Sequence, residues 1–198
     1  IMLIDCGANT DCKPQYLQQF GVMASAYMQS VMGVDNPRIS LLNNGEEAEK
    51  GCELTKAAYK LLSAAPINFA GNCEAREVLS GEFDALVCDG FVGNVVLKYT
   101  EGLASSMMAM LKTELTADFK SKIGAALSMG AFRRFKKKMD YKEVGGAPLL
   151  GINGCVIKAH GSSDAKAFAS AIRQAELFVK GNVNPKIAEA IASLPDEE

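Results

Sequence analysis

The sequence of 198 residues holds a single histidine, no C-x-x-C pair and no apolar run as long as a membrane span. Its six cysteines stand singly, and only one histidine is available to complete a zinc site. We therefore expect reduced cysteines, with no metal site and no disulfide framework. The net charge of -2 provides no basic field, so we expect no nucleic-acid partner.

Two familiar phosphate-binding patterns are also missing. The sequence contains no G-x-x-x-x-G-K-[ST], which excludes a P-loop, and no G-x-G-x-x-G between a strand and a helix. The second absence excludes the usual dinucleotide fingerprint. A phosphate ligand, if there is one, must be bound in another way.

What the sequence does contain is an alternation of strand-like and helix-like segments. Short apolar runs predict strands at 1–5, 38–43, 67–70, 85–88 and 155–159. Helical spacing of apolar residues predicts helices at 14–32, 53–64, 74–79, 92–115, 165–179 and 185–194. Strands that alternate with helices indicate a mainly parallel sheet covered on both faces, an α/β protein in three α/β/α layers. We expect residues 1–198 to form a single α/β region.

Small polar loops rich in glycine follow several of these strands. They read D-C-G-A-N from residue 5, N-N-G-E-E from 43, G-N-C-E from 71, D-G-F-V-G-N from 89 and H-G-S-S-D from 160. The carboxyl ends of parallel strands meet at one rim of a sheet, where helix N-termini offer free amides to anions. The loops therefore predict an anionic or phosphate ligand, held by backbone amides, asparagine side chains and a cation.

Four residues in or next to these loops are candidates for the chemistry, and each has a simpler interpretation. Asp89 and Asn94 are expected to line the crevice, although a turn with an asparagine cap would give the same pattern. Lys50 is the best-placed cation, although a lysine there is also typical of a solvated surface. His160 is the one imidazole available for acid/base work, although helix capping alone explains the residues after it.

A basic segment at 118–140 supports a different prediction. Between Phe119 and Met139 there are seven Lys or Arg residues and no acid, and apolar residues recur every four positions. Gly124 and Gly130 are expected to divide it into two helices. Such a segment suits an anionic membrane surface. It also suits packing on the core or on a partner subunit, or docking of an acidic carrier protein. The expected membrane contacts are Ile123, Leu127, Phe132, Arg133, Arg134, Lys136 and Lys137.

Across nearly its whole length the sequence resembles the carboxyl-terminal part of the phosphate acyltransferase PlsX family of bacterial phospholipid synthesis. The stretches that carry the resemblance are L-I-D-C-G-A-N-T-D-C-K-P, L-L-N-N-G-E-E, K-G-C-E-L-T-K, I-N-F-A-G-N-C-E-A-R, D-G-F-V-G-N-V-V-L-K, G-G-A-P-L-L-G, V-I-K-A-H-G-S-S-D-A-K-A and A-I-R-Q-A. The amino-terminal part of the family's chain is expected to be absent.

The resemblance implies an enzyme that moves a fatty acyl group from acyl carrier protein to inorganic phosphate and makes acyl phosphate. It implies a fold like isocitrate/isopropylmalate dehydrogenase, a homodimer, no cofactor, and a cytoplasmic location with peripheral membrane association. Lys50 and Asn94 match positions that the family uses at its active site. The expected phosphate-binding residues are Asn43, Asn44, Gly45, Asp89, Gly90, Gly93, His160, Gly161 and Ser162.

Two other functions stay open at this point. One is a phosphotransacetylase that acts on coenzyme A thioesters. The other is a catalytically incomplete fragment that binds a membrane or a partner. A dehydrogenase of similar fold is not expected, since the sequence has neither a nicotinamide fingerprint nor a clear set of metal-binding carboxylates.

Overall fold

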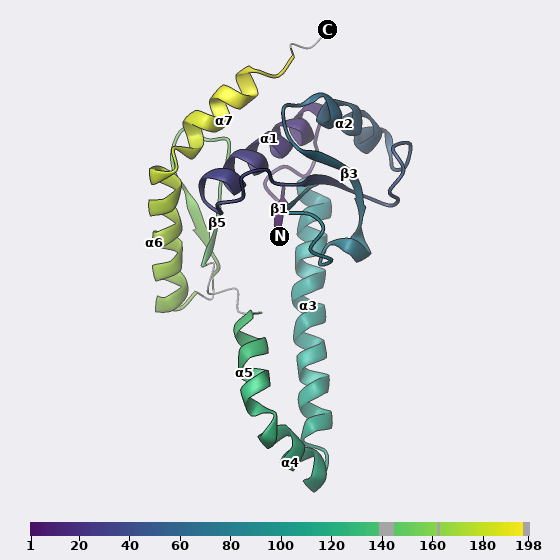
Figure 1. Cartoon of the computed structure of the whole chain (residues 1–198), viewed down its shortest axis with the longest axis vertical. Coiled ribbons are helices and arrows are strands. Elements are labelled where there is room, and N and C mark those ends of the chain that lie inside the picture. Colours follow the sequence, from purple (N-terminus) through teal and green to yellow (C-terminus); the bar gives the residue numbers. More distant parts are fainter. Residues whose placement is uncertain (139–144, 162, 196–198) are drawn as a thin grey trace.

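The structure is a computed structural model that describes residues 1–138, 145–161 and 163–195. Its strands are β1 (Met2–Ile4), β2 (Ile39–Asn43), β3 (Phe69–Glu74), β4 (Ala85–Val87), β5 (Gly146–Pro148) and β6 (Ile157–Ala159). Its helices are α1 (Pro14–Ser30), α2 (Glu53–Ala64), α3 (Gly90–Leu115), α4 (Phe119–Leu127), α5 (Met129–Lys138), α6 (Ala165–Lys180) and α7 (Val183–Ala192), with a 3-10 turn at Ala75–Glu77 (Figure 1).

The main sheet has four strands in the order β1-β4-β2-β3, and every neighbouring pair is parallel. Ile4 of β1 and Leu41 of β2 both pair with Val87 of β4, so the three strands end almost level. At the sheet edge, Asn43 pairs with Glu74 of β3. This confirms the predicted α/β protein with a mainly parallel sheet, an arrangement that agrees with three layers.

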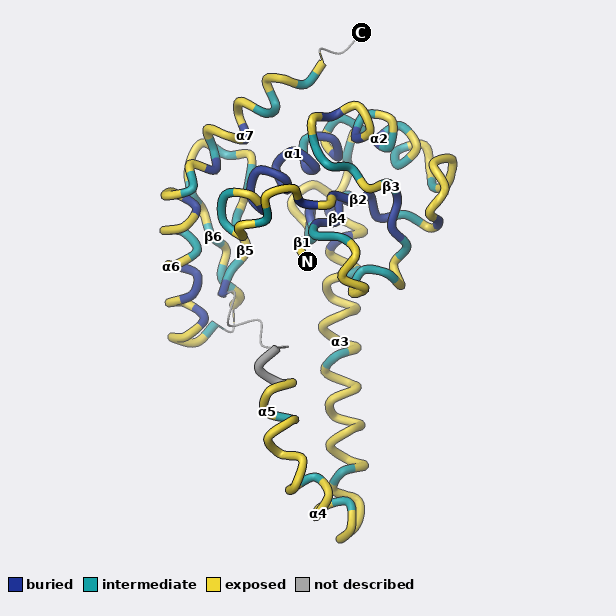
Figure 2. The backbone as a smooth tube through the Cα atoms, viewed as in Figure 1, coloured by how far each residue is buried: buried dark blue, intermediate teal, exposed yellow. Residues whose placement is uncertain are grey.

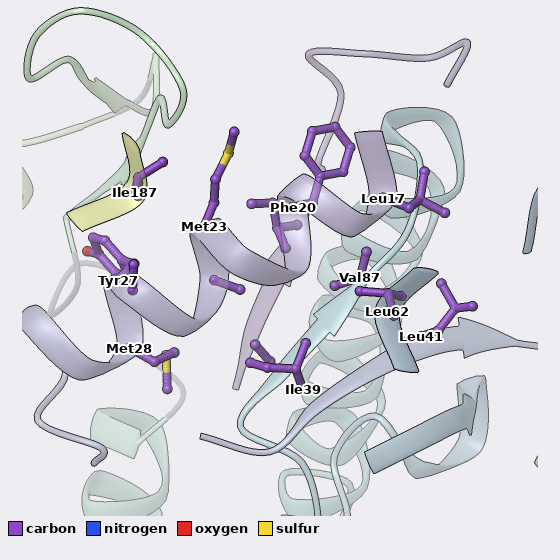
Figure 3. Packing of buried hydrophobic residues seen from close by; sticks show 14 of the residues in the cluster. Leu17, Phe20, Met23, Tyr27, Met28, Ile39, Leu41, Leu62, Val87 and Ile187 are labelled. Carbon is purple, nitrogen blue, oxygen red and sulfur yellow. The ribbon is translucent and has the colours of Figure 1, made fainter. Parts of the chain in front are cut away.

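Helices α1 and α2 pack against this sheet in the core, which α7 completes by packing on α1 with Val183 and Ile187. Proline at the first position of α1 starts the helix, because its fixed φ is helical and its missing N–H is not needed there. Leu17, Leu41, Leu62 and Val87 are fully buried where α1, α2, β2 and β4 meet (Figure 3). Burying each side chain of this size contributes about 2 kcal/mol. Gly21 brings α1 close to α2, since a Cβ there would lie 2.6 Å from Leu62 Cδ2.

The strand after residue 155 departs from the prediction. We expected it in the parallel sheet, but β6 pairs antiparallel with β5 in a separate two-stranded sheet covered by α6. The approach to α6 is close, because a Cβ at Gly145 would overlap Ser170 Cβ. The strand has three residues and a local partner, so it closes a hairpin rather than extending the main sheet.

Helices α3, α4 and α5 extend away from the main sheet (Figure 1). Gly90 and Gly93 are the buried residues of α3, and Figure 2 shows most of its length exposed. The predicted division of the basic segment into two helices is confirmed, but the break lies at Ser128, between the two glycines. Within the described residues, no helix is long and apolar enough to cross a membrane.

Candidate functional site

The loop after β1 is organised by a buried carboxylate. Asp5 is 8% exposed, and its two oxygens accept hydrogen bonds from four donors. The backbone N–H groups of Gly7 and Ala8 donate to Oδ1 at 2.9 Å each, and the N–H of Asn9 donates to Oδ2 at 2.6 Å. The side-chain amide of Asn9 also donates to Oδ2, at 3.0 Å. Acceptance of several backbone amides by one carboxylate fixes the loop as a rigid unit.

The start of α3 rests on this loop. Gly90 N–H donates to Asn9 O at 2.7 Å, and Asp89 caps the helix by accepting from Val92 N–H at 2.8 Å. Gly93 lies so close to the backbone oxygen of Asp5 that a Cβ there would overlap it. These contacts explain the two glycines: both are required by close approach of the helix to the loop after the neighbouring strand.

Asn94 lies at the start of the second turn of α3, near the sheet rim. Its side chain is exposed and lies over Gly7, since a Cβ at Gly7 would be 3.6 Å from Asn94 Cβ and Cγ. Gly7 has a φ of +122°, a value that favours glycine. The Asn94 side chain therefore lies next to the Asp5 loop and is exposed to solvent.

Lys50 ends the loop that follows β2. Its aliphatic stem covers the buried Gly45, where a Cβ would lie 2.6 Å from Lys50 Cγ, and the residue is exposed. The Asn43 side chain is used inside this loop: Nδ2 donates to Lys50 O at 3.1 Å, and Oδ1 accepts from Asn44 N–H at 2.9 Å. Asn43 thus shapes the loop, whereas Lys50 is exposed at its end.

Lys50 and Asn94 follow the adjacent parallel strands β2 and β4, which places their loops on the same rim of the main sheet. His160 and Gly161 follow β6 of the other sheet, so the rim argument does not bring them to this edge. There Asp164 caps α6 by accepting from Ala167 N–H at 3.0 Å. Ser162 lies outside the described residues.

Sequence reasoning missed the importance of Asp5 and Asn72. The first sits in the expected rim loop D-C-G-A-N, and an aspartate before a glycine after a strand is a signal for a loop held by its side chain. Asn72 was expected in the rim loop G-N-C-E, but this segment belongs to β3, which continues to Glu74, and Asn72 is buried there. No pattern in the sequence indicates that its amide is buried.

Cys52 differs from the buried cysteines in its exposure and in the direction of its pKa shift. Cys52 is exposed next to Gly51, and hydrogen bonding from the Thr55 backbone lowers its pKa. Burial raises the pKa of Cys6 and of Cys73 to about 11 each. Burial also raises the pKa of Cys88. Within the part of the chain that the structure describes, no group of three His, Cys, Asp or Glu residues is placed to hold a metal ion.

Comparison with known proteins adds a family to this geometry. The family profile described as "Fatty acid synthesis protein" matches residues 1–186. The chain is 56% identical over 191 residues to "Phosphate acyltransferase" of Clostridium perfringens (strain SM101 / Type A), covering 96% of this chain and 56% of the relative. It is 51% identical over 197 residues to "Phosphate acyltransferase" of Alkaliphilus oremlandii (strain OhILAs), covering 100% of this chain and 59% of that relative. The chain therefore spans less than two thirds of the length of these relatives.

Proposed function

Because the chain belongs to the fatty acid synthesis protein family, we propose that it is part of a phosphate acyltransferase. The proposed reaction moves a fatty acyl group from acyl carrier protein to inorganic phosphate. A phosphate oxygen forms a bond to the thioester carbonyl carbon, and the bond from that carbon to sulfur breaks. Acyl phosphate forms, and the thiolate of the carrier protein leaves and takes up a proton from solvent. The proposal includes a single α/β catalytic region for residues 1–198 and the isocitrate/isopropylmalate dehydrogenase-like arrangement.

The observation that carries the proposal is that Lys50 and Asn94 follow adjacent parallel strands, β2 and β4. Phosphate is already anionic near neutral pH, so the reaction needs position and charge stabilisation more than a general base. Lys50 would bind phosphate, and the Asn94 amide would donate to the developing oxyanion on the thioester. Both side chains are exposed at the rim. Lys50 lies next to Gly45 and Asn94 next to Gly7, and the lack of a side chain at each glycine leaves room for a substrate.

Phosphate itself would be held by the loops around these two residues and by the segment that follows β6 of the other sheet. The proposed contacts are the loop of Asn43, Asn44 and Gly45, the start of α3 at Asp89, Gly90 and Gly93, and the segment His160, Gly161 and Ser162. The dipole at the N-terminus of α3 favours an anion nearby, while the amides of Gly90, Val92 and Gly93 already donate to Asn9 O, Asp89 Oδ1 and Asp89 O. No cofactor or metal takes part in the proposed chemistry.

Substitution of the two central residues tests this function. In a chain extended to the length of its relatives, Asn94→Ala and Lys50→Ala should each lower acyl phosphate formation about 100-fold. Lys56→Ala is the matched control, since Lys56 is an exposed lysine one turn into α2. Equal loss in the Lys56 variant, or full turnover without Asn94, would contradict the assignment. Replacing the carrier protein with coenzyme A distinguishes a phosphotransacetylase.

We also propose that α4 and α5 contact an anionic membrane surface, as peripheral binding by a cytoplasmic protein. Large apolar side chains are open to solvent here, with Ile123 47% and Leu127 84% exposed. Arg133 and Arg134 are exposed beside the half-buried Phe132, and Lys136 and Lys137 belong to α5. Apolar and basic residues on the same short helices support an interfacial position.

Vesicle sedimentation tests the membrane proposal. Vesicles rich in phosphatidylglycerol should bind the protein, and vesicles of phosphatidylcholine alone should bind it weakly. The double variant Arg133→Ala/Arg134→Ala should weaken binding about 30-fold, because each basic residue near the surface contributes about 1 kcal/mol. Lys60→Ala, on α2, should leave binding unchanged. Equal binding to both vesicle types would contradict a role for these charges.

A homodimer is the third part of the proposal. Tyr99 is 69% exposed, Met107 60% and Met110 69%, all on α3. Apolar surface of this extent along one helix is typical of an interface. Sedimentation equilibrium should give twice the monomer mass, and Met107→Glu combined with Met110→Glu should give the monomer. Ser63→Glu on α2 is the control, and a monomeric parent protein would contradict the proposal.

A further inference from the structure

Asn72 is a buried amide on the edge strand of the main sheet. It lies on β3, pairs with Leu41 of β2, and is 5% exposed. A buried amide must have hydrogen-bond partners, because an unpaired polar group out of water is costly. Both ends of the Asn72 amide are paired, and both lead to the loop that carries Lys50.

The two bonds of Asn72 reach the loop at different points. Its Nδ2 donates to Glu47 O at 2.7 Å, in the middle of the loop. Its Oδ1 accepts from Asn43 Nδ2 at 3.1 Å, and that same nitrogen donates to Lys50 O at 3.1 Å. Glu47 O also accepts from Lys50 N–H at 3.0 Å. Asn72 therefore fixes both backbone polar groups of Lys50. It holds Glu47 O, which accepts from Lys50 N–H, and it holds Asn43 Nδ2, which donates to Lys50 O.

Close packing next to Lys50 makes the position of the loop more specific. Gly51 has a φ of +97°, and a Cβ there would lie 2.5 Å from Asn43 Oδ1. Gly51 therefore turns the chain next to the Asn43 side chain, which Asn72 orients. A shift of the Asn43 amide would break its hydrogen bond to Lys50 O and release the backbone of Lys50 there.

We propose that Asn72 is a positioning residue for phosphate binding: it holds the loop that sets the place of Lys50 and does not touch the substrate. This inference rests on the proposed role of Lys50 as the phosphate-binding cation. Asn72 would act on the binding of inorganic phosphate and not on the binding of the acyl thioester. Loss of the Asn72 bonds should therefore be felt in the affinity for phosphate.

Asn72→Asp is the sharpest variant. The two side chains have nearly the same shape, but in aspartate an anionic oxygen replaces Nδ2 and faces Glu47 O, while the oxygen opposite Asn43 is kept. Asn68→Asp is the matched control: Asn68 lies just before β3, and its Nδ2 also donates to a backbone carbonyl, Asn36 O, at 3.3 Å. Asn72→Ala, which removes both bonds without adding a charge, serves if the aspartate variant does not fold.

Kinetics of the chain extended to the length of its relatives give the first measurement. Asn72→Asp should raise KM for phosphate about tenfold, the size expected for one buried hydrogen bond, and leave KM for the acyl thioester unchanged. Asn68→Asp should change neither constant. A merely structural role would reduce the active fraction, and so kcat, without moving KM for phosphate. That result would overturn the proposal.

Hydrogen exchange gives a second measurement that needs no turnover. In the peptide that covers 44–51, exchange should be about tenfold faster in Asn72→Asp and unchanged in Asn68→Asp. Unchanged exchange in both variants would contradict the claim that Asn72 fixes the loop. An inactive parent enzyme would instead reject the proposed function, while exchange would still decide whether Asn72 fixes the loop. Faster exchange with an unchanged KM for phosphate would refute the link to Lys50.

Discussion

Replacing Asp5 with asparagine removes acceptors at the centre of the candidate site. Each carboxylate oxygen of Asp5 accepts two hydrogen bonds, from Gly7 and Ala8 at Oδ1 and from the backbone and side chain of Asn9 at Oδ2. In Asp5→Asn, whichever oxygen becomes NH₂ faces two donors, so two bonds are lost in either orientation. A hydrogen bond to a charged group contributes about 1.5 kcal/mol or more, so the free energy of unfolding should fall by about 3 kcal/mol.

Thermal and urea unfolding, followed by circular dichroism, measure this loss. A fall of about 3 kcal/mol lowers the midpoint temperature of a chain this long by about 10 °C. Asp11→Asn is the control, because Asp11 belongs to the same loop and is exposed. A change below about 0.5 kcal/mol in Asp5→Asn, within the range of ordinary surface substitutions, would refute the view that Asp5 holds the loop.

Three further changes follow from local geometry. Gly93→Ala should lower the free energy of unfolding by about 2 kcal/mol in urea titrations, because the new Cβ would overlap the backbone oxygen of Asp5. Cys52 should be the first cysteine alkylated by iodoacetamide in mass spectra, because it is exposed and its pKa is lowered. Hydrogen bonds from Arg38 lower the pKa of Asp84 from 3.8, so the stability that this carboxylate contributes should be complete above pH 3.8 and decline on further acidification.

Each of these has its own control. Gly102→Ala, on an open part of α3, should stabilise the protein slightly, since no atom lies within 4 Å of the new Cβ. Alkylation of the buried Cys88 before Cys52 would contradict the order of reactivity. Acid unfolding of Asp84→Asn should lack the contribution lost below pH 3.8, and an acid titration identical to that of the parent would contradict the linkage.

Much of the fold could be predicted because strong patterns lie in continuous segments. Helical spacing placed α2 at Glu53–Ala64, as the structure has it, and the run from Ala85 correctly indicated a strand before a long helix. The hairpin could not be predicted in the same way. Its first strand, Gly146–Pro148, contains a glycine and a proline, which weaken any strand signal, and alternation alone does not tell which sheet a strand joins.

The sequence predicted that the loops of Lys50 and Asn94 share one rim of the sheet, but it predicted neither the bonds inside those loops nor that His160 and Gly161 follow a separate sheet. A loop after a parallel strand indicates a rim, which is why Lys50 and Asn94 were selected, and the family resemblance favoured the same two residues. Which amide holds the loop depends on contacts between distant segments. Asn43 was predicted to bind phosphate, and the sequence did not indicate that its side chain also bonds within the loop and to Asn72, 29 residues away. The spacing of residues along the sequence does not indicate that Asn43 and Asn72 are hydrogen-bonded.

The central claim is that this chain supplies the Lys50 and Asn94 rim of a phosphate acyltransferase. The most direct measurement is acyl phosphate formation from palmitoyl-acyl carrier protein and inorganic phosphate, by this chain and by the chain extended to the length of its relatives. The account predicts turnover by the extended chain that falls about 100-fold with Asn94→Ala. Absence of acyl phosphate from a folded extended chain would contradict the account, and binding to anionic vesicles without turnover would favour a binding function instead.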